Sequence, residues 1–207
     1  MPAKFEFGAN FVLVLAAAAI VAALAGALGA VYLSPFLVDD SVRIRDYYLS
    51  ENAVHTSPHS VRVNMDKGKT NYLLVDLRSQ QEYEREHVIG AVNIPAYKDP
   101  ATPAYEDVDR IVGAFAALPK GKEIIAYCYS MPCMTGRKIG KILAERGIYV
   151  KMLNIGWNEW RYYWTLWNHE GENASVEDYV VSGPQPGAPK PVGAVKSTCG
   201  QNGQTSC

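Results

Sequence analysis

The chain has 207 residues, which is enough for one domain of ordinary size and an appendage. Its formal net charge is −1, so it lacks the basic surface that nucleic-acid binding requires, and we expect no nucleic acid among its partners. Its four cysteines are too few to form the disulfide framework of a chain this long. The hydrophobic residues are distributed unevenly, and this distribution predicts the first element.

That element is an apolar segment near the N-terminus. Residues 11–38 contain no charged side chain, and residues 11–33 are almost entirely Ala, Val, Leu, Ile and Gly. A helix of this length crosses a hydrocarbon core of ~30 Å. The alternative is a signal peptide cleaved at the small residues 25–27, but the apolar run continues beyond them. We expect residues 1–38 to form a single-pass anchor in a lipid bilayer.

The charges that flank this segment favour neither orientation clearly. Lys4 precedes it, whereas Arg43 and Arg45 follow it together with two aspartates. Because a short segment before the first span usually stays inside, we expect the remaining domain to lie outside the cytoplasm. Gly26 and Ala30 are small residues four positions apart, a spacing that lets another helix approach closely. A membrane-protein partner is therefore a further expectation.

Residues 39–56 are charged and aromatic, and we interpret them as a juxtamembrane stalk. Beyond them, the alternation of strands with helices predicts an α/β fold in which helices cover both faces of a parallel sheet. We place this domain at residues 57–170. We expect residues 171–207, which are rich in Gly and Pro and include Cys199 and Cys207, to be a flexible tail without a core. The predicted strands are 72–76, 90–95, 123–128 and 149–153, and the predicted helices are 80–87, 108–118 and 135–146.

The segment 128–137 joins a predicted buried strand to the next helix. Ligands of open α/β sheets bind beyond the carboxyl ends of the strands, so a site is expected there. A cysteine at such a turn lies near free backbone N–H groups, which stabilise a thiolate, and Arg137 adds a charge able to bind an oxyanion. The alternative is that Cys128 is a buried apolar side chain and Arg137 a solvated one.

Residues 57–168 resemble the rhodanese-like family, and several short motifs in a fixed order carry the resemblance. These motifs are Val75-Asp76-Leu77-Arg78, Glu82-Tyr83, His87 to Pro95, Tyr127-Cys128, and Gly156-Trp157 with Trp160. The resemblance implies sulfur transfer without a cofactor. A cysteine thiolate attacks the outer sulfur of thiosulfate or polysulfide, becomes a persulfide and passes the sulfur to cyanide or a thiol acceptor. It also implies that Asp76, Arg78, Glu82 and His87 are structural.

Two cysteines compete for the role of nucleophile. The family's cysteine ends the central strand, which favours Cys128, whereas the string from Cys133 to Arg137 resembles the Cys-x-x-Gly-Arg loop of some small members. We favour Cys128, with Cys133 as a resolving thiol that converts a persulfide into a disulfide. Cys128, Cys133 and Arg137 are therefore the expected catalytic residues. The expected substrate contacts are Tyr129, Ser130, Met131, Met134, Thr135 and Gly136.

Other functions remain open beside this one. The related phosphatases need Cys-x5-Arg, and position 134 is Met rather than Arg, which disfavours ester hydrolysis. A docking or accessory subunit of a membrane complex, without turnover, and a redox protein that uses Cys128 and Cys133 are the two alternatives. The four histidines are scattered and no Cys-x-x-Cys pair occurs, so we expect no metal site. We expect the aromatic residues at 157–167 to pack in the core and contact the membrane surface.

Overall fold

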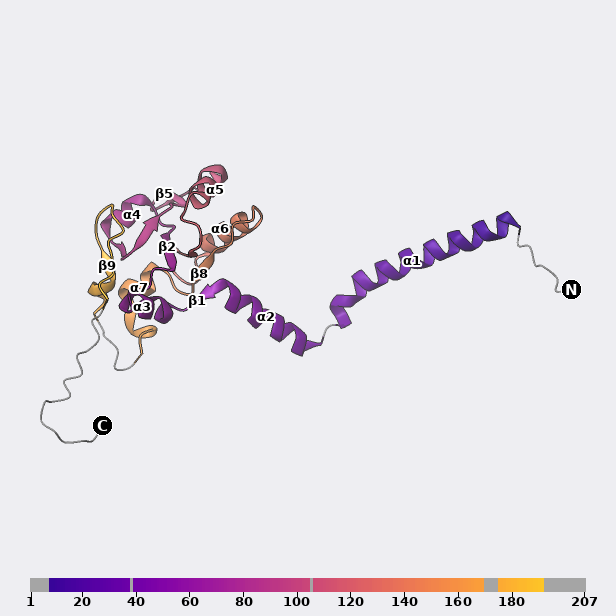
Figure 1. Cartoon of the computed structure of the whole chain (residues 1–207), viewed down its shortest axis with the longest axis horizontal. Helices are drawn as coiled ribbons and strands as arrows, with labels where there is room; N and C mark the ends of the chain where they lie inside the picture. The colour runs from indigo at the N-terminus through magenta and orange to yellow at the C-terminus, as the bar shows by residue number, and fades with distance from the viewer. Residues whose placement is uncertain (1–7, 38, 105, 170–174, 192–207) are drawn as a thin grey trace, which may run out of the picture. The chain divides into compact units, whose positions relative to one another are not determined.

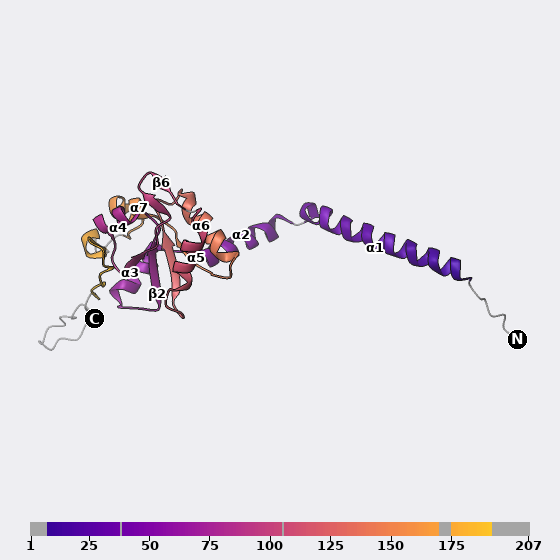
Figure 2. The same cartoon turned by 90° about the horizontal axis from the view of Figure 1, so that it is seen from above.

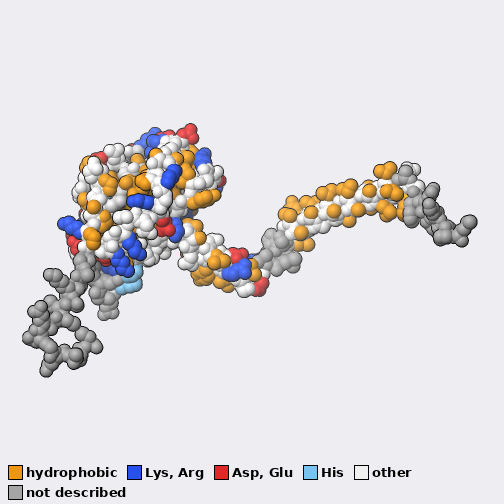
Figure 3. Space-filling view, viewed as in Figure 1, with side chains coloured by type: hydrophobic (Ala, Val, Ile, Leu, Met, Phe, Trp, Pro, Cys, Tyr) orange, Lys and Arg blue, Asp and Glu red, His pale blue; other side chains and the backbone are white. Residues whose placement is uncertain are grey.

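A computed structural model describes residues 8–37, 39–104, 106–169 and 175–191. The chain divides into two units at Ser50 and Glu51. The first unit contains helix α1 (Ala9–Leu37), of which Asn10–Leu33 forms a stretch of 24 residues with a mean hydropathy of 2.7. Hydrophobic side chains cover its visible surface (Figure 3). At 1.5 Å per residue this stretch is about 36 Å long. Among the described residues, it is the one helix with the length and composition to cross a membrane.

The predicted stalk is mostly a helix. Helix α2 (Asp40–Val54) has no buried residue, and strand β1 (His55–Thr56) follows it. The assignment of 55–56 to the stalk is wrong, because β1 pairs in parallel with strand β8 (Lys151–Leu153), in the register His55 to Met152. A two-residue strand has no hydrophobic periodicity, so only its pairing with β8 identifies it.

The second unit contains the expected parallel sheet covered by helices. The strands lie in the order β1-β8-β7-β2-β4, and every neighbouring pair is parallel. Figure 1 labels β1, β8 and β2 of this sheet. The central strands are β7 (Glu123–Tyr127) and β2 (Tyr72–Asp76), and β4 (Ala91–Asn93) is an edge strand. The helices are α3 (Pro58–Asp66), α4 (Gln80–Arg85), α5 (Val108–Ala116), α6 (Met134–Ala144) and α7 (Trp157–Tyr162).

The two faces of the sheet bury different sets of side chains. Leu74 and Ile125 belong to the cluster formed with α3 and α7, whereas Val75 and Ala126 belong to the cluster formed with α5 and α6. Figure 2 shows β2 between α3 and α5. Because successive side chains of a strand point to opposite faces, Cys128 lies on the same face as Ala126 and packs in the cluster of α5 and α6.

Short elements complete the domain. Strand β3 (His87–Val88) pairs antiparallel with β9 (Val180–Val181), and β5 (Tyr97–Asp99) pairs with β6 (Thr102–Pro103). Two 3-10 helices are η1 (Trp164–Leu166) and η2 (Val176–Tyr179). Of the tryptophans at 157–167, Trp157 and Trp160 lie in α7, Trp164 lies in η1, and Trp167 follows η1. Trp157, Trp160 and Trp164 are buried in the core, and Tyr162 and Tyr163 are exposed.

The prediction of a coreless tail from residue 171 is wrong for residues 175–191. Val176 and Tyr179 are buried in the cluster with α3, and the Tyr179 hydroxyl donates a 2.7 Å hydrogen bond to Asp66. The pairing of β9 with β3 adds main-chain hydrogen bonds. This packing needs few apolar residues, so the high Gly and Pro content of the segment led to the prediction that it has no core. Cys199 and Cys207 lie outside the described residues.

Candidate active site

The loop between β7 and α6 places two cysteine sulfurs side by side at the carboxyl edge of the sheet. Cys128 follows the last residue of β7, and Cys133 is the N-cap residue of α6. The Cys133 N–H donates a 3.0 Å hydrogen bond to the Ser130 carbonyl, which closes a turn. The two Sγ atoms lie 3.2 Å apart, and both cysteines are free. The site therefore contains a close pair of thiols rather than a single one.

The environment of the pair favours a negative charge on Cys133. Hydrogen bonding from the Cys128 thiol is the largest influence and, with the hydroxyl and N–H of Thr135 and the N–H of Tyr129, lowers the pKa of Cys133 to about 5. The neighbouring Cys133 and burial raise the pKa of Cys128. Cys128 is only 4% exposed, whereas Cys133 is half-buried. These influences favour ionisation of Cys133 before Cys128.

The Thr135 hydroxyl that supports Cys133 is itself fixed. Thr135 lies in the first turn of α6, its side chain is buried, and its Oγ1 is 2.7 Å from the hydroxyl of Tyr97. Tyr97 lies in β5, so a strand outside the main sheet helps to orient a group at the thiolate. The Thr135 and Tyr129 groups near the Cys133 sulfur thus favour its thiolate form.

The N-terminus of α7 holds the other side of the loop. The N–H groups of Trp157 and Asn158 each donate a 2.8 Å hydrogen bond, to the carbonyls of Cys128 and Tyr129 respectively. A Cβ atom at Gly156 would lie 2.2 Å from the Ser130 nitrogen, far inside contact distance. Glycine at position 156 is therefore a steric requirement of the loop conformation.

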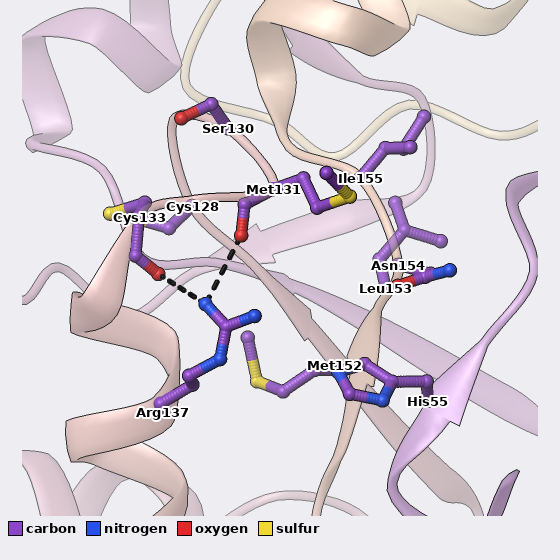
Figure 4. Close-up of a pocket in the computed structure, with 10 residues that line it drawn as sticks. All are labelled: His55, Cys128, Ser130, Met131, Cys133, Arg137, Met152, Leu153, Asn154 and Ile155. Carbon is purple, nitrogen blue, oxygen red and sulfur yellow. Dashed lines mark hydrogen bonds between the residues drawn. The ribbon is translucent and has the colours of Figure 1, made fainter. Parts of the chain in front are cut away.

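A small pocket opens beside the two sulfurs (Figure 4). Arg137 extends along one wall, and its Nη1 donates hydrogen bonds of 3.1 and 3.4 Å to the carbonyls of Met131 and Cys133. The guanidinium therefore holds the loop and lies at the pocket at the same time. The residues that line the pocket are His55, Cys128, Ser130, Met131, Cys133, Arg137, Met152, Leu153, Asn154 and Ile155.

The predicted substrate contacts are distributed differently. Ser130 and Met131 line the pocket, but the other four do not. The Tyr129 hydroxyl donates to a carboxylate oxygen of Glu82, and Met134 is exposed. Thr135 supports Cys133, and Gly136 packs against the side chain of Met152.

Sequence reasoning missed the wall of the pocket that β1 and β8 contribute. His55 lies in β1, and Met152 and Asn154 lie in and directly after β8. The Nδ1 atom of His55 is buried and has no hydrogen-bond partner among the described residues. The only signal in the sequence is that β8 ends at the same edge of the sheet as β7, because carboxyl ends of parallel strands lie together.

Asp76 and Arg78 form a buried ion pair below the loop. Their side chains are 0% and 3% exposed, and Arg78 Nη2 lies 2.7 Å from Asp76 Oδ2. Arg78 also donates to the Glu86 carbonyl and lies over the Trp157 ring, 4.2 Å from its centroid. The Tyr127 hydroxyl donates to Asp76 at 2.7 Å. The pair therefore joins the ends of the central strands to α7.

The other two residues expected to be structural differ in their contacts. Glu82 accepts hydrogen bonds from the hydroxyls of Ser79 and Tyr129, so it connects α4 to the loop. His87 is fully buried, stacks on Tyr83 with ring centroids 3.6 Å apart and lies 2.7 Å from the Tyr83 carbonyl through Nδ1. Burial lowers the pKa of His87. It also hydrogen-bonds to the backbone of Gln185, so it connects the α4–β3 segment to the C-terminal segment.

The sequence model of the rhodanese-like domain family matches residues 57–162, which make up half of the chain. The chain belongs to the rhodanese-like family. This family includes sulfurtransferases and also members without catalytic activity. The transcriptional regulator Rv0324 of Mycobacterium tuberculosis, described as HTH-type, is 32% identical to the rhodanese-like chain over 88 residues. That match covers 42% of this chain and 34% of the regulator, so the chain spans about a third of that relative.

Solved structures also resemble this rhodanese-like chain. The BH2092 protein of Bacillus halodurans has 24% identity and a TM-score of 0.49, and the match covers 59% of this chain and 82% of that one. The rhodanese-like domain of the Alr3790 protein of Anabaena sp. has 16% identity and a TM-score of 0.36, and the match covers 50% of this chain and 67% of that one. An uncharacterized protein of Saccharomyces cerevisiae has 25% identity and a TM-score of 0.40, and the match covers 54% of this chain and 93% of that one.

Proposed function

We propose that this protein is a membrane-anchored sulfurtransferase in which Cys133 carries the transferred sulfur. One observation supports this most directly. Cys133 is half-buried at the N-terminus of α6, lines a pocket that Arg137 also lines, and lies next to Thr135 and a second thiol. Such surroundings favour the thiolate, which is the reactive form of cysteine.

The proposed reaction has two steps. The Cys133 thiolate attacks the outer sulfur of thiosulfate, the sulfur–sulfur bond of thiosulfate breaks, and sulfite leaves with the electron pair. Cyanide or a thiolate then attacks the outer sulfur of the resulting persulfide and regenerates the Cys133 thiolate. Polysulfide reacts in the same way and releases a shorter polysulfide. Both donors are anions, and the N–H groups of the loop and the Arg137 guanidinium supply positive potential where they bind.

This proposal changes the preferred nucleophile from Cys128 to Cys133. Cys128 ends the central strand as the family motif does, but its side chain is packed in the apolar cluster of α5 and α6. A buried thiol resists ionisation, because burial disfavours the charged form. Cys133 is more accessible, and the neighbouring groups of the loop lower its pKa. We therefore assign Cys128 the role of hydrogen-bond donor to the nucleophile.

We also propose that α1 anchors the protein and that the domain lies outside the cytoplasm. The support for anchoring is the length and hydropathy of Asn10–Leu33, and the support for orientation is the short segment that precedes this span. Intact cells treated with a membrane-impermeant thiol reagent test the orientation. Labelling of Cys133 before lysis is expected, whereas labelling only after lysis would place the domain in the cytoplasm.

The test of the activity uses the full-length protein in detergent, with thiosulfate as donor and cyanide as acceptor. We expect thiocyanate to form, Cys133→Ser to abolish it, and the matched Cys128→Ser variant to retain measurable turnover. Full turnover in Cys133→Ser would overturn the assignment of the nucleophile. If the wild type forms no thiocyanate from thiosulfate or polysulfide, the sulfurtransferase proposal fails and a docking subunit without turnover becomes the better account.

A further inference from the structure

We infer that the same site carries out a second reaction, in which Cys128 attacks the persulfide on Cys133 and releases sulfide. This inference rests on the proposed sulfurtransferase function, because that function supplies the persulfide. It goes further by giving the carried sulfur a second outcome. Instead of passing to an external acceptor, the sulfur leaves as sulfide and the two cysteines close a disulfide.

The distance between the sulfurs carries the inference. The two Sγ atoms lie 3.2 Å apart, and a disulfide bond is ~2.05 Å long. Closure therefore requires an approach of only about 1.2 Å, which side-chain rotation within the turn from Ser130 to Cys133 can supply. A thiol this close competes effectively with an external acceptor, because a positioned group reacts at a high effective concentration.

The arrangement also leaves the carried sulfur in a position to depart. Cys128 lies on the buried side of Cys133, within the cluster of α5 and α6. The pocket lies beside both sulfurs and is bounded by Arg137, Met131 and His55. Attack along the bond axis requires the outer sulfur to extend away from Cys128, and the pocket beside the pair offers space for it. Attack by Cys128 along the bond axis displaces it back into the pocket.

The chemistry of this step balances without another reagent. The Cys128 thiol attacks the Cys133 sulfur, the Cys128–Cys133 bond forms, and the bond between Cys133 and the outer sulfur breaks. The outer sulfur leaves with the bonding electrons and takes the proton of Cys128, so the product is hydrosulfide. The two cysteines are oxidised to a disulfide, and the carried sulfur is reduced to sulfide.

A second turnover needs a reductant, and an external dithiol is the chemical class that fits. Its thiolate attacks the more exposed Cys133 sulfur, Cys128 leaves, and the second thiol of the reductant resolves the mixed disulfide. The sum of the steps converts thiosulfate and a dithiol into sulfite, sulfide and the oxidised dithiol. A thiol acceptor supports the transfer reaction, and a dithiol also reduces the disulfide with both of its sulfurs and so regenerates Cys128 and Cys133.

A single-turnover experiment tests the inference. The full-length protein in detergent carries Cys199→Ser and Cys207→Ser, so that the loop holds its only thiols. It is reduced, freed of reductant and mixed with thiosulfate in the absence of an acceptor. Sulfite and sulfide are quantified, and the intact mass is measured. We expect about one equivalent of each product per reacted protein and the mass loss of two hydrogens that a disulfide requires.

The matched variants separate the two proposals. Cys128→Ser should release sulfite but no sulfide and should gain the mass of one sulfur atom, whereas Cys133→Ser should release neither product. Sulfite release by the parent protein with a stable persulfide and no sulfide would overturn this inference and leave the sulfurtransferase proposal intact. Absence of sulfite from the parent protein would overturn the sulfurtransferase proposal itself.

Discussion

Replacement of Cys128 by alanine should change the pH at which Cys133 becomes reactive. In the wild type, the hydrogen bond from Cys128 is the largest cause that lowers the pKa of Cys133 to about 5. Below this pH Cys133 is protonated, and above it Cys133 is a thiolate. Alanine removes the S–H donor and leaves the Thr135 and Tyr129 groups in place. The pKa of Cys133 should therefore rise toward the value of an unperturbed cysteine, about 8.5.

The size of the effect follows from the fraction of thiolate. At pH 6 a thiol with a pKa of about 5 is roughly 90% ionised, whereas one with a pKa near 8 is roughly 1% ionised. The rate of alkylation at pH 6 should therefore fall roughly three- to sixfold in Cys128→Ala, because the greater nucleophilicity of the less acidic thiolate offsets most of the loss of ionised form. At pH 9 Cys133 should react faster in Cys128→Ala than in the wild type. The thiol is then ionised in both proteins, and the less acidic thiolate is the stronger nucleophile, with a Brønsted coefficient of about 0.4–0.5.

The assay is the rate of reaction of Cys133 with iodoacetamide between pH 4 and pH 9, followed by peptide mass spectrometry. Cys199→Ser and Cys207→Ser form the background of each protein. Cys128→Ser is the matched control, because its hydroxyl is still a donor and should keep the midpoint low. If Cys128→Ala and the parent protein share one midpoint, or if the parent midpoint lies near that of an unperturbed thiol, Cys128 does not lower the pKa of Cys133.

Three further substitutions probe the support of the site. Gly156→Ala places a Cβ 2.2 Å from the Ser130 nitrogen, so the loop must move by about 1 Å and thiocyanate formation should fall roughly 100-fold. Asp76→Asn leaves the buried Arg78 without its counter-ion, and urea titration should show a loss of about 3–5 kcal/mol in the free energy of unfolding. His55→Leu removes an unpartnered nitrogen beside the pocket. The KM for thiosulfate should rise roughly tenfold, and His55→Gln should restore part of it.

The central part of the fold can be predicted from the sequence because its signals are local. The apolar run at 72–76, the second run at 123–128 and the periodic helix at 108–118 coincide with β2, β7 and α5 to within two residues. The sequence does not predict strands that are defined only by pairing with a strand far away in the chain. Strands β1 and β9 are two residues each, and only main-chain pairing with β8 and β3 defines them.

The site, like the fold, is predictable from the sequence only where its residues are close together in the chain. The loop from Cys128 to Arg137 is contiguous, so its place after a central strand indicates the site. The relation between its two sulfurs depends on the turn closed by Ser130 and on the contact of the loop with Gly156, and neither is a sequence pattern. The contribution of His55 depends on strand order alone. Strand position consequently favoured Cys128, whereas accessibility and hydrogen bonding favour Cys133.

The position of the transferred sulfur tests the central claim most directly. The full-length protein is mixed with thiosulfate, alkylated at once with an excess of iodoacetamide so that Cys128 cannot react further, digested and examined by tandem mass spectrometry. We expect the alkylated fragment that contains Cys133 to carry one additional sulfur atom and Cys128 to carry none. An additional sulfur on Cys128, with none on Cys133, would contradict the proposal that Cys133 is the nucleophile of this site.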